Sequence, residues 1–75
     1  MSRLPGLTAR SVIQALERAG VYVALVKGSH YLLKHPANAR LRVTVPFHRG
    51  DLDRRTLRSI VDQAGLTVEE FIELI

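Results

Sequence analysis

The fold of this 75-residue chain depends on one stretch near its middle, Val21-Tyr22-Val23-Ala24-Leu25-Val26-Lys27-Gly28-Ser29-His30-Tyr31-Leu32-Leu33. Two apolar runs rich in β-branched and aromatic residues flank a Lys-Gly-Ser-His sequence, so both runs are predicted strands. Gly28-Ser29 has the chemistry of a tight turn, because glycine tolerates a positive φ and serine can bond its own backbone. His30 would then lie at the rim of a sheet, within reach of a ligand. Histidines ordinarily titrate near a pKa of about 6.5, so a histidine at such a rim can move a proton at neutral pH.

Length and composition predict one small domain, residues 1–75, with a thin core. With 47% hydrophobic and 24% charged residues, the chain is globular rather than disordered. No apolar run approaches the ~20 residues of a membrane span, and residues 1–6 lack the apolar core of a signal peptide. We therefore expect a cytoplasmic protein that does not contact a membrane. The lack of cysteine excludes disulfides and thiolate-bound zinc.

Charge is distributed unevenly along the chain. Residues 1–61 hold all 11 basic residues and only three acidic ones, whereas the last fourteen residues hold four acids and no base. A basic body with an acidic tail suggests a polyanionic partner and weakly favours nucleic acid. The alternative is an ordinary solvated surface rich in arginine.

Taken in order, the chain predicts three helices and three strands. The expected elements are a helix from Thr8 to about Ala19, strands at residues 21–26, 30–35 and 40–45, a helix over about residues 52–64, and a short closing helix after residue 67. Thr67 and Glu70 form a capping box for the closing helix, which would place Phe71, Ile72 and Ile75 on its apolar side. This order, α-β-β-β-α with a short C-terminal helix, predicts a two-layer α+β sandwich with a three-stranded antiparallel sheet.

One face of the predicted sheet should remain uncovered, because two main helices can cover only the other. The first strand is apolar on both faces, so the open face should show an apolar patch ringed by Lys34, Arg40 and Arg42. Such a patch suggests a protein partner or self-association, unless loops and the last helix cover it.

The three histidines are predicted to divide between the two faces and ends of the sheet. If the turn at residues 36–39 closes symmetrically, the partners are His30 with Val45 and His35 with Arg40. His48 then falls near the same end of the sheet as His30, together with Lys27 and Ser29. His35 is five positions from His30 and should face the opposite way, so we interpret it as structural or solvated.

Two histidines in a basic cleft suggest cleavage of RNA through the substrate's own 2′-hydroxyl. That reaction needs a base for the hydroxyl proton, an acid for the leaving oxygen, and positive charge on the phosphate. Imidazole and Lys or Arg side chains can supply these groups, so no metal or other cofactor is expected. The alternatives are a surface histidine at His30 without a catalytic role, and a metal site at His48 and Asp51. Two ligands are weak evidence for such a metal site.

Positive charge that could hold RNA phosphates lies on the strands and on the second main helix. Arg54, Arg55 and Arg58 form a basic stripe at helical spacing. The residues predicted to contact RNA are Lys27, Gly28, Ser29, Lys34, Arg40, Arg42, Arg54, Arg55 and Arg58.

Four segments occur in a characteristic order along almost the whole chain, from about Gly6 to Ile75. They are Gly28-Ser29-His30, Val45-Pro46-Phe47-His48, Thr56-Leu57-Arg58-Ser59-Ile60 and Ala64-Gly65-Leu66-Thr67-Val68-Glu69-Glu70-Phe71. Together they resemble the HicA family. The resemblance implies a fold like the double-stranded-RNA-binding domain. It also implies the toxin of a toxin–antitoxin pair, acting as a metal-independent ribonuclease on messenger RNA. His30 would be catalytic, and Gly28 would be needed for the shape of the site.

The same resemblance implies a HicB-type antitoxin as partner, which covers the site and carries a DNA-binding module. Contact with DNA would then be indirect, through the antitoxin. The sequence departs from the family pattern at Val21, Leu25 and Arg55, but not at His30. The alternative function is a non-catalytic RNA-binding or protein-binding module with the same fold.

Overall fold

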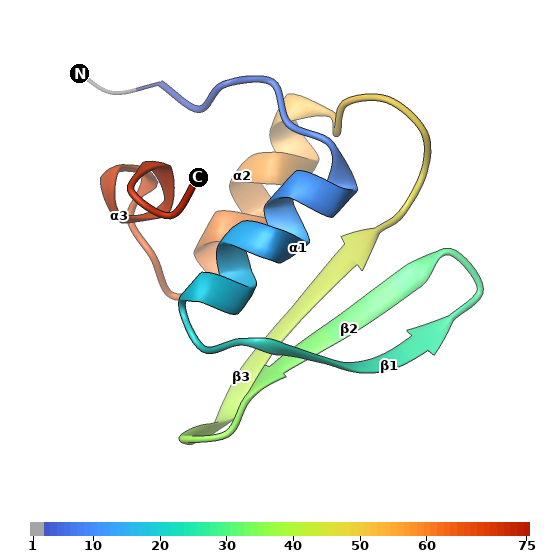
Figure 1. Cartoon of the computed structure of the whole chain (residues 1–75), viewed down its shortest axis with the longest axis vertical. Helices are drawn as coiled ribbons and strands as arrows, with labels where there is room; N and C mark the ends of the chain where they lie inside the picture. The colour runs from blue at the N-terminus through green and yellow to red at the C-terminus, as the bar shows by residue number, and fades with distance from the viewer. Residues whose placement is uncertain (1–2) are drawn as a thin grey trace.

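The computed structural model describes residues 3–75, in which three helices pack with one three-stranded sheet (Figure 1). In chain order, the elements are α1 (Ala9–Arg18), β1 (Tyr22–Lys27), β2 (His30–His35), β3 (Asn38–Pro46), α2 (Arg54–Gln63) and α3 (Val68–Ile72). The strands pair antiparallel in the order β1-β2-β3. This confirms the predicted α+β fold with its short C-terminal helix. None of the helices in residues 3–75 has the length and apolarity that crossing a membrane requires.

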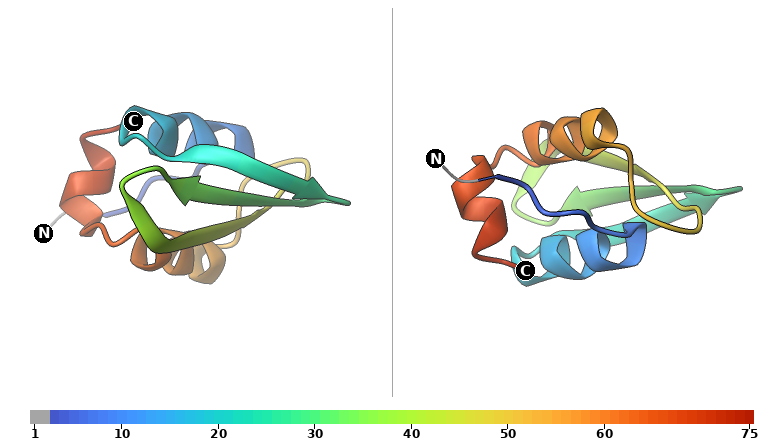
Figure 2. Two further views of the ribbon diagram at one scale, coloured as in Figure 1. Left: turned by 90° about the horizontal axis from the view of Figure 1, so that it is seen from below. Right: turned by 90° about the horizontal axis from the view of Figure 1, so that it is seen from above.

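The core lies between the sheet and the helices, which cover the same face of the sheet (Figure 2). Its fully buried members come from every layer of the fold: Val12, Ala15 and Leu16 of α1, Leu33, Val43 and Val45 of the sheet, Leu57, Ile60 and Val61 of α2, and Phe71 of α3. Burying one side chain such as Leu or Val contributes about 1.5–3 kcal/mol. The buried positions of each main helix recur at spacings of three and four, so its core face follows the helical period.

Asp53 determines where α2 begins. Its Oδ2 atom accepts the backbone N–H groups of Arg55 (3.1 Å) and Thr56 (3.3 Å), which otherwise lack partners in the first turn. The helix therefore begins at Arg54, two residues later than predicted. Leu52, the predicted start, is buried in the core ahead of the helix.

The closing helix α3 begins at the predicted capping box. Thr67 and Glu70 exchange side-chain and backbone hydrogen bonds of 2.8 and 3.1 Å. Phe71 is fully buried, as its predicted apolar side requires. The prediction is wrong for Ile75, which is 45% exposed. The helix α3 ends at Ile72, so Ile75 is not part of its apolar side.

A β-bulge at Ala24 interrupts the pairing of β1 with β2. The partners on its two sides are Val23 with Leu33 and Leu25 with Leu32. One extra residue in β1 reverses the alternation of side chains beyond it. Without the bulge, Lys27 would share a face with Val23, which packs against the core. With the bulge, Lys27 pairs with His30 and lies on the open face.

The turn between β2 and β3 is shorter than predicted. It consists of Pro36 and Ala37 alone, and the N–H of Ala37 donates to Nδ1 of His35 (3.0 Å). β3 therefore begins at Asn38 rather than at Arg40.

The register of β2 against β3 also differs from the symmetrical one. The observed partners are His35 with Asn38, Lys34 with Arg42, and His30 with Pro46, so the predicted partners Arg40 and Val45 are wrong. Residues 39–41 have no partner in this register, because the pairing shifts between His35 and Lys34. Within that irregularity, Oδ1 of Asn38 accepts the N–H of Arg40 (3.1 Å), a local bond that competes with the strand ladder.

Candidate active site

The site is built on the two-residue turn between β1 and β2. Gly28 has a φ of 59°, and no residue other than glycine in residues 3–75 has a positive φ. Glycine at the first position followed by an ordinary residue is the pattern of a type II′ hairpin turn. A Cβ atom at Gly28 would meet nothing within 4 Å. The backbone conformation, rather than lack of space, is therefore what requires glycine here.

His30 and Lys27 lie side by side at the end of the sheet. They are Cα partners across the turn, and directly paired residues share a face. Tyr31, the next residue, pairs with the fully buried Val45 on the core side, so His30 and Lys27 occupy the open face. Both are exposed, and this end of the hairpin projects beyond the helices in Figure 2. His30 is therefore accessible from solvent, with Lys27 as its cross-strand neighbour on the same face.

The loop after β3 brings His48 to the same end of the sheet. The N–H of Phe47 donates to the carbonyl oxygen of Ser29 (2.6 Å), which holds the start of the loop against the β1–β2 turn. His48 follows Phe47 directly and is exposed. The structure thus brings the segments that carry His30 and His48 together at this end of the sheet, although the symmetrical register on which that expectation was based is wrong.

Asp51, the other residue considered as a metal ligand, lies against the N-terminal segment. A Cβ atom at Gly6 would lie only 2.7 Å from the Oδ2 atom of Asp51, and the backbone of Asp51 forms an isolated antiparallel β-bridge with Thr8. Among residues 3–75, no group of three or more potential ligands could hold a metal ion. The geometry therefore does not add a third ligand to His48 and Asp51.

His35 occupies a structural position at the opposite end of β2. Its Nδ1 atom accepts from Ala37, and its Nε2 atom would lie 3.0 Å from a Cβ atom at Gly20. Gly20 has a φ of 90°, so this position both bends the chain after α1 and leaves room for the ring. His35 is half-buried between the turn and the end of α1, in agreement with its structural interpretation.

The open face carries the predicted apolar patch. Tyr22 and Leu25 of β1 are 46% and 55% exposed, and Leu32 of β2 lies beside them. We call these three residues the open-face patch. Lys34 and Arg42 are paired on the same face, next to the patch. The patch is therefore apolar at its centre and basic at its rim.

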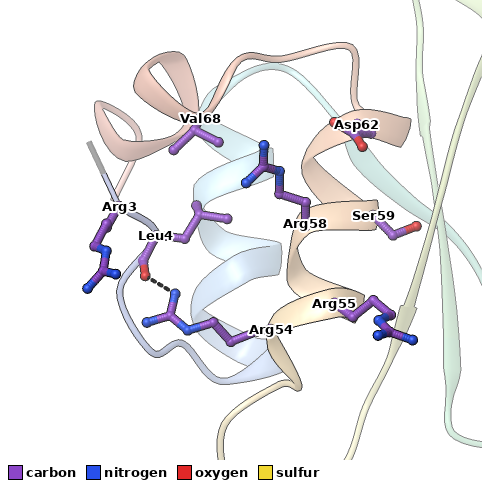
Figure 3. A pocket seen from close by; sticks show the side chains of 8 residues that line it. All are labelled: Arg3, Leu4, Arg54, Arg55, Arg58, Ser59, Asp62 and Val68. Carbon is purple, nitrogen blue, oxygen red and sulfur yellow. Dashed lines mark hydrogen bonds between the residues drawn. The ribbon is translucent and has the colours of Figure 1, made fainter. Parts of the chain in front are cut away.

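The α2 arginines do not share this face. Figure 3 shows Arg54 and Arg58 directed toward the N-terminal segment and α3, while Arg55 lies on the other flank of α2. The guanidinium of Arg54 donates to the carbonyl oxygen of Leu4. The hollow around them is lined by Arg3, Leu4, Arg54, Arg55, Arg58, Ser59, Asp62 and Val68. The predicted RNA contacts thus divide into two surfaces, one on the hairpin and open face and one on α2.

A pair of aromatic rings at this end of the molecule was not predicted from the sequence. The rings of Tyr31 and Phe47 stack with centroids 4.8 Å apart. Each is adjacent in sequence to one of the two exposed histidines, His30 and His48. That adjacency was the available signal, but the stack forms only because β2 and β3 pair.

The chain also matches a known protein family. The family model described as the HicA toxin of bacterial toxin–antitoxin systems matches residues 9–66. The matched region runs from α1 through α2 and contains both His30 and His48, and it ends before α3. Comparison with curated protein sequences found no match. Because the family model covers well over half of the chain, the protein belongs to the HicA family of toxins from bacterial toxin–antitoxin systems.

Proposed function

We propose that this HicA-family chain is a ribonuclease toxin that cleaves messenger RNA in the cytoplasm without a metal ion. One observation carries the proposal: His30 is exposed on the open face with Lys27 as its cross-strand partner, at the end of the sheet reached by the His48 loop. Two imidazoles and an ammonium group therefore lie on neighbouring segments, and this supports the proposal.

The proposed reaction uses the 2′-hydroxyl of the substrate as the nucleophile. His30 takes the hydroxyl proton as the 2′-oxygen bonds to phosphorus, and the bond from phosphorus to the 5′-oxygen breaks. His48 is proposed to protonate that leaving oxygen. The products are a 2′,3′-cyclic phosphate and a 5′-hydroxyl. Each proton transfer of this kind contributes roughly 10²–10⁴-fold to a rate, and the Lys27 ammonium would stabilise the charge on the phosphate.

The proposed RNA path begins at the hairpin turn and continues over the open face. Lys27, Gly28 and Ser29 would contact the phosphate that is cleaved. Lys34 and Arg42, which are paired on the same face, would hold the adjoining phosphates, with Arg40 in the irregular stretch beyond them. Arg54, Arg55 and Arg58 lie on α2, so we assign them to long-range attraction and to the more distant phosphates of the RNA.

The open-face patch supports a protein partner in addition to RNA. Exposed Tyr22 and Leu25 with basic neighbours fit a partner that is apolar at its centre and acidic at its rim. We propose that this partner is a HicB-type antitoxin, which would cover His30 when bound. Contact with DNA would be indirect, through the antitoxin.

The deciding experiment is cleavage of a messenger RNA fragment by the purified protein in the presence of a chelator. We expect the wild type to cleave and His30→Ala to lose roughly 10²–10⁴-fold in rate. His30→Ala should still bind RNA, because the charges that hold the phosphates remain. The same fragment with 2′-deoxyribose at each position should resist cleavage. Full activity in His30→Ala would refute the mechanism, and RNA binding without any cleavage by the wild type would favour the non-catalytic alternative.

A further inference from the structure

A second hollow lies behind the sheet end that carries His30, between α1 and the strands. Its volume is about 250 Å³, and it is lined by Arg10, Ile13, Gln14, Glu17, Tyr31 and Phe47. The Tyr31 and Phe47 rings are stacked at 4.8 Å with an angle of 27° between their planes. Both rings are only half-buried, whereas Val45, the partner of Tyr31, is fully buried. Part of the surface of the Tyr31 and Phe47 rings is therefore not buried in the core.

Polar side chains of α1 form the opposite wall of this hollow. Arg10, Gln14 and Glu17 follow one another at spacings of four and three, which places them on one face of the helix. All three are exposed, and Ile13 lies buried between them. A guanidinium, an amide and a carboxylate together supply several hydrogen-bond donors and acceptors opposite two aromatic rings.

The hollow lies on the core side of β2, whereas His30 faces the open side, but its two rings are sequence neighbours of the candidate catalytic residues. Tyr31 follows His30 and Phe47 precedes His48, and neighbouring Cα atoms are ~3.8 Å apart. The bond from Phe47 N–H to the Ser29 carbonyl (2.6 Å) joins the two segments at the sheet end. A nucleotide next to the cleaved phosphate could therefore pass around the hairpin end and place its base between α1 and the rings.

We propose that this hollow binds a nucleobase of the RNA substrate, next to the bond that is cleaved, and sets a base preference. The inference rests on the proposed ribonuclease function and deepens it. Proteins read single-stranded RNA by stacking bases on aromatic rings and bonding to the base edges. When it is ionised, the Glu17 carboxylate can accept hydrogen bonds but cannot donate them, and its negative charge repels phosphate. The hollow therefore offers an acceptor for N–H donors of a base edge at Glu17, while the Arg10 guanidinium in the same wall can donate to base carbonyl oxygens or to a phosphate.

A binding experiment tests this proposal without requiring cleavage. The His30→Ala protein is titrated with each of the four ribonucleoside 5′-monophosphates, and with ribose 5-phosphate as the control that lacks a base. We expect saturable shifts of the Tyr31 and Phe47 ring resonances in nuclear magnetic resonance spectra, with unequal affinities among the four nucleotides. Ribose 5-phosphate should leave the ring resonances unchanged. No shift with any nucleotide, or equal shifts with ribose 5-phosphate, would overturn the proposal.

Cleavage measurements then connect the site to specificity. Gln14→Ala and Glu17→Gln should change the distribution of cleavage sites in one RNA, with a loss of roughly 10-fold at the preferred site, the scale of one lost base contact. Glu73→Gln is the matched control, because it removes one exposed carboxylate outside the hollow. Phe47→Leu keeps the apolar packing and removes the ring. An unchanged cleavage pattern in both Gln14→Ala and Glu17→Gln would refute the assignment.

The two experiments also separate this inference from the ribonuclease proposal. If the wild type cleaves no RNA but nucleotides shift the Tyr31 and Phe47 resonances, the base site stands and the ribonuclease function fails. If the wild type cleaves RNA but nucleotides do not reach the rings, the ribonuclease function stands and the base site fails.

Discussion

Lys27 and His30 are Cα partners across a two-residue turn, and the bulge at Ala24 is what places Lys27 on the face that His30 occupies. A regular strand from Tyr22 to Lys27 would direct Lys27 to the core side with Val23. The insertion of one residue therefore decides whether the candidate site contains a cation beside its imidazole. Bulges often change the direction of side chains next to functional sites, and the bulge at Ala24 does this for Lys27.

The turn glycine supports a prediction with a closely matched control. Gly28 and Gly65 have φ values of 59° and 72°, and a Cβ atom at either would meet nothing within 4 Å. Replacing either with Ala should lower the free energy of unfolding by about 1–3 kcal/mol, the cost of a positive φ for a residue that has a Cβ atom. Only Gly28→Ala should also lower kcat, by roughly 10²-fold, because it displaces His30 from Lys27. Equal kcat values for the two folded variants would contradict this role.

His48→Ala tests the proposed acid. We expect kcat to fall by roughly 10²-fold or more, because the leaving oxygen would lose its proton donor. His35→Ala is the control: it should leave kcat unchanged and reduce stability by about 1 kcal/mol through the lost bond to Ala37. Single-turnover cleavage rates and urea unfolding measure the two effects. A loss of only a few-fold in His48→Ala would make His48 a positioning residue.

The salt dependence of RNA binding should distinguish the two basic surfaces. For single strands, each phosphate contact contributes about −0.7 to the slope of log K against log salt concentration. We expect Lys34→Ala and Arg42→Ala each to flatten this slope by about 0.7. Arg58→Ala should change it less, because Arg58 is directed toward the N-terminal segment and α3. Fluorescence anisotropy with His30→Ala as the background measures binding without cleavage. An affinity that does not change with salt would exclude phosphate contacts as the basis of binding.

The open-face patch predicts how partner binding can be lost. Leu25→Asp introduces a charge at a side chain that is 55% exposed, so the fold should tolerate it. It should abolish co-purification with the proposed HicB-type antitoxin, because that partner would have to bury the charge. Ile75→Asp is the control at a residue that is 45% exposed and outside the patch. Retention of the partner by Leu25→Asp would place the interface elsewhere.

The closing helix should matter for stability although the family model ends at residue 66. Phe71 is fully buried, so Phe71→Ala should lower the free energy of unfolding by about 3–5 kcal/mol, measured in urea. A domain of this size has only about 5–15 kcal/mol in total, so this change should remove much of its stability. Ile75→Ala should change stability by less than about 0.5 kcal/mol. A cost below 1 kcal/mol for Phe71→Ala would show that α3 packs weakly.

Helix positions could be predicted from sequence because short-range physics governs them. The buried positions of α1 and α2 follow the helical period, and Thr67 with Glu70 marks the start of α3. The start of α2 was less predictable, since Leu52 continues the apolar pattern but Asp53 provides the cap. Ile75 fits the same period as Phe71 and is nevertheless exposed, because the helix ends before it.

Local sequence was sufficient for the order of elements, for the tight turn at Gly28 and for the rim position of His30, because backbone preference and periodicity act over a few residues. The tertiary structure decided the rest. It set the partners of β3 through the irregularity at residues 39–41, and it turned Arg54 and Arg58 away from the sheet. Pairing of β2 with β3 also stacked Tyr31 on Phe47. Register, bulges and ring stacking depend on residues far apart in the chain, and a pattern read along the sequence does not contain those distances.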